Sequence, residues 1–294
     1  MKNEFSINAV KGAKWLSMVI TMMFIVSCSN DESSLDEDTN KQTVITATEL
    51  QYSDEAEQIS EEITVIAEVI YAGDEISANS KSAFVSDFLP DCVTITTVVT
   101  DTTKEKTIDF GAGCELPNGN VLSGVIQMNY AKDMEQATKT ISVMLENFTF
   151  NEVAVEGSSE IIRMRSNEAG NPQGTATTAY SVIWPDGETA SYSGTRTREW
   201  IEGYGSSFWG DNVFLITGSA SYTNKLGNTY AKTITEPLRR EIACRFIVSG
   251  VLEISRNENT VDLDFGDGTC DAKGTLIFED GTTEEIFLRR FLNN

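Results

Sequence analysis

The segment from Tyr192 to Trp209 contains the densest group of side chains that could bind a ligand. Four of them share one face of an extended strand by alternation, and two follow in a glycine-rich loop. The six candidates are Tyr192, Arg196, Arg198, Trp200, Tyr204 and Trp209. Aromatic rings can stack on sugars, and arginine binds carboxylates through a bidentate fork. We therefore weigh a glycan-contacting surface against ordinary core and rim packing, and packing is the favoured interpretation.

The familiar kinds of nucleophilic catalysis are excluded by composition, because the chain has no histidine. Ser/His/Asp and Cys/His centres, and zinc or iron sites built on histidine, cannot form. Carboxylate chemistry, as in glycosidases, needs only two acids at a defined separation. Since the chain has 45 acidic residues, the sequence nominates no pair. We name no catalytic residue, metal ligand or cofactor, and the balance favours a protein without catalytic activity.

Acidic residues are concentrated between Asp262 and Asp271, where the sequence is at first sight similar to a calcium-binding loop. An EF-hand needs an acid or an asparagine where Gly266 stands, and a glutamate several residues further on. The segment does not meet these requirements. We therefore interpret it as a strand with alternating acids followed by a turn.

Four cysteines form two pairs of similar context, Cys92 with Cys114 and Cys244 with Cys270. In each pair a β-branched strand follows the first cysteine, and a polar turn and a second strand lead to the other. Because the turn lies midway, a hairpin places the two cysteines opposite each other at its open end. We therefore expect two disulfides within these pairs. Each should stabilise the folded chain by about 3 kcal/mol, because it lowers the conformational entropy of the unfolded chain. Free thiols are the alternative.

An Asp-Phe-Gly motif ends the returning strand of both hairpins. The motif runs from Asp109 to Cys114 in the first copy and from Asp264 to Cys270 in the second, and a glycine and an apolar strand follow each. Two copies of one hairpin module are the simplest explanation. In these motifs the chain resembles a family of surface lipoproteins of Bacteroidetes, of the flavobacterial type, with repeated Asp-Phe-Gly-x-Gly-Cys hairpins. The resemblance implies an envelope location and a β-rich fold, and it brings no activity with it.

Residues 1–27 have the pattern of a secretory signal. Three lysines precede an apolar run of about 12 residues, which is short for a bilayer core that needs roughly 20. The sequence Ile25-Val26-Ser27-Cys28 resembles the bacterial lipobox, whose cysteine is lipidated. This resemblance implies that residues 1–27 are removed and that Cys28 carries the lipid. A non-cleaved membrane anchor is the alternative.

Residues 28–47 are expected to form a flexible acidic tether, because the segment after Cys28 has many acids and few apolar residues. Ser29 and the acids behind it resemble the surface-export signal of Bacteroidetes lipoproteins. We therefore expect a protein anchored in the outer membrane and displayed on the cell surface, with a periplasm-facing lipoprotein as the alternative.

The acidic composition limits the partners. The formal net charge is −23, and nucleic acid is an unfavourable partner because phosphate binding needs a basic surface. The expected partners are the membrane, through the lipid, and an extracellular glycan or another envelope protein.

One helix is predicted over residues 48–73, with Gly73 as its end. Its apolar stripe consists of Ile59, Ile63, Ile66 and Ile70, and the glutamates away from that stripe are Glu57, Glu61, Glu62 and Glu68. An apolar stripe of this period packs against another element. We expect it to pack on the β region, and a partner protein is the alternative.

From Cys92 onward the chain reads as about 12 strands separated by turn dipeptides such as Asp280-Gly281. We predict a mainly β fold, either an antiparallel β-sandwich or an extended meander, built from two related disulfide-closed hairpin modules. A closed barrel is the alternative architecture. Residues 82–165 would form the first β-rich half and residues 166–294 the second. These features favour a lipid-anchored, non-catalytic binding or scaffolding protein; a carboxylate-based glycan hydrolase and a structural subunit of a surface appendage are the alternatives.

Overall fold

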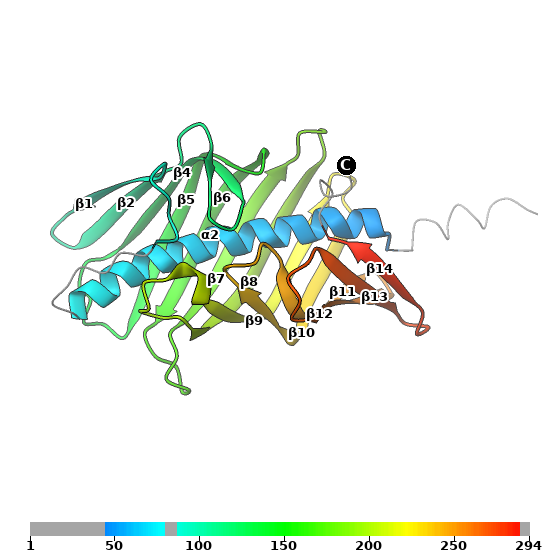
Figure 1. Cartoon of the computed structure of the whole chain (residues 1–294). Coiled ribbons are helices and arrows are strands. Elements are labelled where there is room, and N and C mark those ends of the chain that lie inside the picture. The colour runs from blue at the N-terminus through cyan, green and yellow to red at the C-terminus, as the bar shows by residue number, and fades with distance from the viewer. Residues whose placement is uncertain (1–44, 80–86, 289–294) are drawn as a thin grey trace, which may run out of the picture. The chain divides into compact units, whose positions relative to one another are not determined.

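The computed structural model describes residues 45–79 and 87–288. In this part of the chain the helix α2 (Ala47–Asn79) precedes an antiparallel sheet of fourteen strands, so the fold is mainly β as predicted. Figure 1 shows α2 lying across the sheet, from β14 (Thr283–Phe287) towards β1 (Thr94–Val99) and β2 (Thr103–Asp109). A short 3₁₀ turn, η1 (Trp209–Asp211), precedes the ninth strand.

The strands form one continuous meander in chain order. Apart from β1, β2 and β14, they are β3 (Cys114–Glu115), β4 (Val121–Ala131), β5 (Thr138–Phe150), β6 (Val153–Met164), β7 (Gln173–Ile183), β8 (Thr189–Glu202), β9 (Val213–Asn224), β10 (Thr229–Glu241), β11 (Ile247–Arg256), β12 (Asn259–Asp267) and β13 (Lys273–Phe278). Short β3 lies off this path and pairs with β4. Of the architectures expected, the meander is the one present. The pairing of β6 with β7 makes the sheet continuous across residues 165 and 166.

Both predicted disulfides are present. Cys92–Cys114 closes the hairpin β1–β2, and Cys244–Cys270 closes the hairpin β11–β12. The turn between β11 and β12 lies midway between its cysteines and the turn between β1 and β2 lies close to midway, and the predicted pairing is confirmed.

The two Asp-Phe-Gly segments share one side-chain hydrogen bond. The Asp109 carboxylate accepts a hydrogen bond from the N–H of Gly111 (2.7 Å), and Asp264 accepts one from the N–H of Gly266 (2.8 Å). The phenylalanine that follows the aspartate, Phe110 in the first copy and Phe265 in the second, is buried. The aspartate therefore binds the backbone two residues further on, at the end of β2 in the first copy and within β12 in the second, while the phenylalanine anchors the segment in the core.

Two Ser-Gly-Val segments bend the sheet. The strand register shifts at Gly124 in β4 and at Gly250 in β11, and both glycines have positive φ, +78° and +107°. A Cβ at Gly124 would collide with the carbonyl oxygen of Asn147, and one at Gly250 would lie 2.5 Å from that of Pro237. Bulges of this kind bend a strand and increase its twist, which helps the sheet to curve around the helix.

The helix begins with a capping box. The side chain of Thr46 accepts a hydrogen bond from the N–H of Glu49 (3.3 Å), and Glu49 accepts one from the N–H of Thr46 (3.1 Å). These reciprocal bonds satisfy two of the backbone N–H groups at the helix start.

The helix does not end at Gly73 as the sequence predicted, but continues to Asn79. Beyond Gly73, Asp74 binds two lysines of β2, and Glu75 binds an arginine of β6. These contacts hold the last turns against the sheet. They outweigh the roughly 1 kcal/mol that a glycine costs inside a helix.

Every residue of α2 from Ser53 to Ala72 is buried. The isoleucine stripe packs in the core with the strands, as predicted. The glutamates predicted to lie away from the stripe are buried as well, each at most 2% exposed. They are buried although they lie off the stripe, because the curved sheet covers more than one side of the helix. No helix in the described ranges has both the length and the apolar character needed to cross a membrane.

Candidate functional site

Four of the six side chains predicted to form a ligand surface are buried. Tyr192, Arg196 and Arg198 are each 1% exposed and Trp200 is 4% exposed, all on β8. The predicted alternation along this strand is present, but the shared face points towards α2. These side chains therefore belong to the interior, in line with the packing interpretation, and do not form an outer surface.

The other two predicted residues lie at the rim of the same core. The Tyr204 hydroxyl donates a hydrogen bond to Glu75 (2.9 Å), and its ring packs edge-on against Trp200 at 5.2 Å between centroids. The backbone N–H of Trp209 donates to Asp87 (2.7 Å). Both Tyr204 and Trp209 are half-buried. Their contacts within the chain fix them in place.

The arginines of β8 bind carboxylates in bidentate forks, but the carboxylates belong to the helix of the same chain. Arg196 donates to both oxygens of Glu57 (2.8 and 3.0 Å), and Arg198 donates to both oxygens of Glu61 (2.6 Å each). Lys232 on β10 adds a third contact to Glu57 at 3.0 Å. Burial alone would raise the pKa of Glu57, but the charges of Arg196 and Lys232 more than offset this effect and hold that pKa well below its usual range.

Similar ion pairs follow the helix over most of its length. They join Glu49 to Arg256, Glu62 to Arg240, Asp74 to Lys104 and Lys106, and Glu75 to Arg163 and Arg165. Burial opposes ionisation of Asp74, but hydrogen bonds from Tyr130 and the two lysines keep its pKa lowered. The inner face of the sheet thus carries a row of lysines and arginines, which pair with the acidic residues along α2. Among the described residues, these inward-pointing carboxylates lie against the sheet and are held by cations.

Glu68 differs from these paired acids. It is 1% exposed, and neither oxygen of its carboxyl group has a hydrogen-bond partner among the described residues. The group fills the space above Gly174 of β7, where a Cβ would overlap it. Burial raises the pKa of Glu68, and the nearby charges of Arg198 and Arg163 offset this only in part. Folding therefore favours a proton on Glu68.

Two of the acids in the segment from Asp262 to Asp271 accept hydrogen bonds in the turn after β12. Asp267 accepts hydrogen bonds from the backbone N–H and the hydroxyl of Thr269 (3.2 and 2.7 Å), and Asp271 accepts one from the N–H of Lys273 (3.0 Å). The geometry is that of strand β12 followed by a turn. Within residues 45–79 and 87–288, no group of three or more acids or cysteines is arranged to hold a metal ion.

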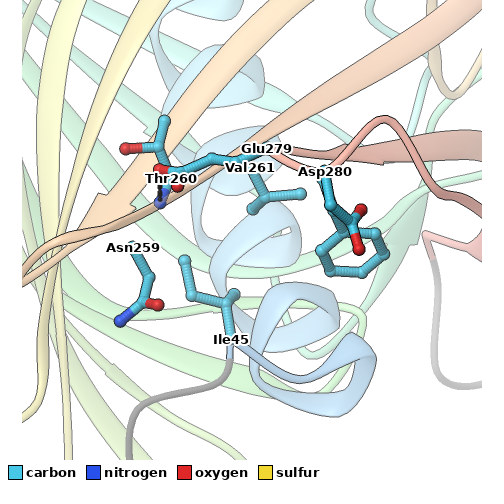
Figure 2. Close-up of a pocket in the computed structure, with 7 residues that line it drawn as sticks. Ile45, Asn259, Thr260, Val261, Glu279 and Asp280 are labelled. Carbon is cyan, nitrogen blue, oxygen red and sulfur yellow. Dashed lines mark hydrogen bonds between the residues drawn. The ribbon is translucent and has the colours of Figure 1, made fainter.

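A small hollow lies beside the start of α2 (Figure 2). Its volume is about 230 Å³, and its walls are Ile45, Asn259, Thr260, Val261, Phe278, Glu279 and Asp280. The carboxylate of Glu279 accepts a hydrogen bond from the N–H of Thr260 (3.1 Å). The volume is below the roughly 300–1,000 Å³ of pockets that hold drug-sized ligands. We assign no ligand to it.

The two edge strands of the sheet differ in their protection. All six residues of β1 are exposed and none is charged, and Ile95, Val98 and Val99 are 42%, 53% and 59% exposed. Strand β14 instead carries Glu284 and Glu285 at exposed positions. Charged side chains on an edge strand hinder pairing with another chain. Strand β14 is therefore protected, whereas the outer edge of β1 is open among the described residues.

The sequence predicted only the first disulfide hairpin for this segment and did not indicate an open edge. The uncharged, β-branched run from Thr94 to Val99 is the signal that could have identified it.

Comparisons of the chain with models of protein families, with curated proteins and with solved structures give no match.

Proposed function

We propose that this chain is a lipid-anchored protein of the cell envelope that acts as a non-catalytic binding or scaffolding module and contacts its partner through β1. The observation that carries the proposal is the open edge. Among the described strands, β1 pairs only with β2, and its other side offers unpaired backbone groups flanked by exposed apolar side chains. A partner strand could add to this edge, with main-chain hydrogen bonds supplying affinity and alternate side chains supplying specificity.

The interior supports a scaffolding role. The bidentate bonds from Arg196 to Glu57 and from Arg198 to Glu61 fix the helix against the sheet in one register. A buried ion pair of good geometry penalises other arrangements, because a displaced partner would leave a charge buried alone. A sheet held in this way presents its edge in a constant shape.

The anchor in this proposal is the lipid on Cys28, with residues 28–47 as the tether. The support is the lipobox-like sequence at residues 25–28 and the acidic stretch behind it. We place the protein in the outer membrane, on the cell surface.

Crosslinking from the edge strands in cells that produce the full chain tests the proposal. A photoreactive amino acid in place of Val98 on β1 should crosslink to a protein partner, and one in place of Glu284 on β14 should give far less product. In the same cells, Cys28→Ala should move the chain out of the membrane fraction. Equal crosslinking from both strands, or none from β1, would contradict the role of β1; a Cys28→Ala chain that stays in the membrane would contradict the lipid anchor.

A further inference from the structure

The hydrogen bonds of the β1–β2 hairpin determine which backbone groups face the open edge. The hairpin turn closes with a bond from the N–H of Thr100 to the carbonyl of Thr103 (2.9 Å). In an antiparallel pair, positions that bond to the neighbouring strand alternate with positions that do not. With the observed register, the residues whose N–H and C=O groups face the open edge are Ile95, Thr97 and Val99.

The side chains of the same three residues lie on the helix side of the sheet. Ile95 pairs across the strands with Ile108, which is buried, and Thr97 and Val99 pair with two lysines that bind Asp74 of α2. Ile95 and Val99 are nevertheless 42% and 59% exposed. They continue the inner face of the sheet beyond the part that the helix covers. An added strand would extend that face.

We infer that β1 pairs antiparallel with β1 of a second copy of this chain, with Thr97 of both copies on the twofold axis. This inference rests on the proposed function and names its partner. In this register Ile95 lies opposite Val99 of the second copy. Each edge-facing residue donates one backbone hydrogen bond to the residue opposite it and accepts one from that residue. A slip by one residue would turn the side chains to opposite faces. A shift of the register by two residues or more would place at least one edge-facing residue opposite a residue outside β1, where it has no strand to pair with.

The charges favour a second copy at β1 and oppose one at β14. When a strand pairs with its own copy, a charge on it comes close to a like charge. Strand β1 has no charge, whereas self-pairing of β14 would bring Glu284 and Glu285 near their own copies. The net charge of −23 adds a long-range repulsion between copies that salt screens. Attachment to one membrane raises the effective concentration of copies and favours the pair.

Cysteine crosslinking of the full lipidated chain in detergent tests the register. Directly opposed, hydrogen-bonded residues have Cα atoms about 5.5 Å apart, within the range that a disulfide spans. Under mild oxidant, Thr97→Cys should give a covalent dimer. The matched control is Thr102→Cys, an exposed threonine in the hairpin turn that the twofold axis places far from its own copy, and it should stay monomeric. Equal dimer from both variants, or none from Thr97→Cys, would overturn the inference.

A proline substitution provides a second measurement. Because the N–H of Thr97 faces the open edge, Thr97→Pro removes no bond between β1 and β2 but blocks the added strand. We expect it to abolish the dimer, measured by light scattering, and to leave the secondary structure of the folded chain, measured by circular dichroism, unchanged. A Thr97→Pro chain that is folded and still dimeric would overturn the inference. Open polymers of the parent chain that form through β14 would overturn it as well. If β1 crosslinks in cells to a different protein and not to its own chain, the second copy is wrong while the proposed function stands.

Discussion

At the scale of single residues, the acids of α2 differ in environment although they share one helix. Glu57 lies between Arg196 and Lys232, whereas Glu68 is equally buried and has no hydrogen-bond partner in the described part of the chain. Burial of a carboxylate is costly unless cations and hydrogen bonds compensate it. The same substitution, glutamate to glutamine, should therefore have opposite effects at the two positions.

At neutral pH we expect Glu57→Gln to lower the free energy of unfolding by about 3–5 kcal/mol, because it leaves two buried cations without their negative partner. We expect Glu68→Gln to be neutral or stabilising, since it removes an acid whose pKa burial raises. Urea unfolding of both variants and the parent measures the difference. A Glu68→Gln chain destabilised as strongly as Glu57→Gln would show that Glu68 is an ionised partner of Arg198 or Arg163.

The pH dependence separates the two positions further. The folded pKa of Glu57 lies below its ordinary value of 4.5, so its contribution is present above pH 4.5 and is lost as the pH falls towards the folded pKa. The deficit of Glu57→Gln should shrink in acid. The folded pKa of Glu68 is raised above 4.5, so its contribution is present below pH 4.5 and is lost as the pH rises through the folded pKa. The relative stability of Glu68→Gln should therefore grow between pH 4 and pH 8.

At the scale of elements, the bulge in β11 should tolerate only glycine. A Cβ at Gly250 would lie 2.5 Å from the carbonyl oxygen of Pro237, at a φ of +107°. We expect Gly250→Ala to cost about 2–4 kcal/mol in the free energy of unfolding, since strain and a backbone clash combine. Gly111→Ala is the matched control, with φ of +63° and no atom within 4 Å of the added Cβ, and it should cost about 1–2 kcal/mol. Equal costs in urea unfolding would mean that the bulge relaxes.

The elements also show what the sequence can and cannot predict. The cysteine pairs could be predicted because the turn between two cysteines is a local feature. The end of α2 could not, because the contacts that carry it past Gly73 come from β2 and β6, far along the chain. Alternation identified the shared face of Tyr192 and Arg196, but it does not say what covers that face. An amphipathic pattern identifies which glutamates lie off the apolar stripe, but it does not say whether water or a curved sheet covers them.

At the scale of the whole molecule, the acidic and basic residues are distributed unequally between core and surface. Eight lysines and arginines are buried among the described residues, of 22 basic residues in the chain, whereas seven acids are buried of 45. A far larger share of the cations is thus buried, and seven of the eight buried cations form ion pairs with acids of α2. The outer surface is more acidic than the composition suggests, and its charges repel one another.

The stability of the monomer should therefore rise with salt. Surface charges are screened within about 10 Å at 0.1 M ionic strength, whereas buried pairs such as Arg198 with Glu61 are screened much less. We expect the free energy of unfolding to increase by on the order of 1 kcal/mol between 20 mM and 0.5 M sodium chloride, because repulsion decreases while the interior pairs persist. Urea unfolding of Thr97→Pro measures this without a contribution from pairing of two copies. A fall in stability with salt would mean that attractive surface pairs, such as Lys273 with Glu285, outweigh the repulsion between acids.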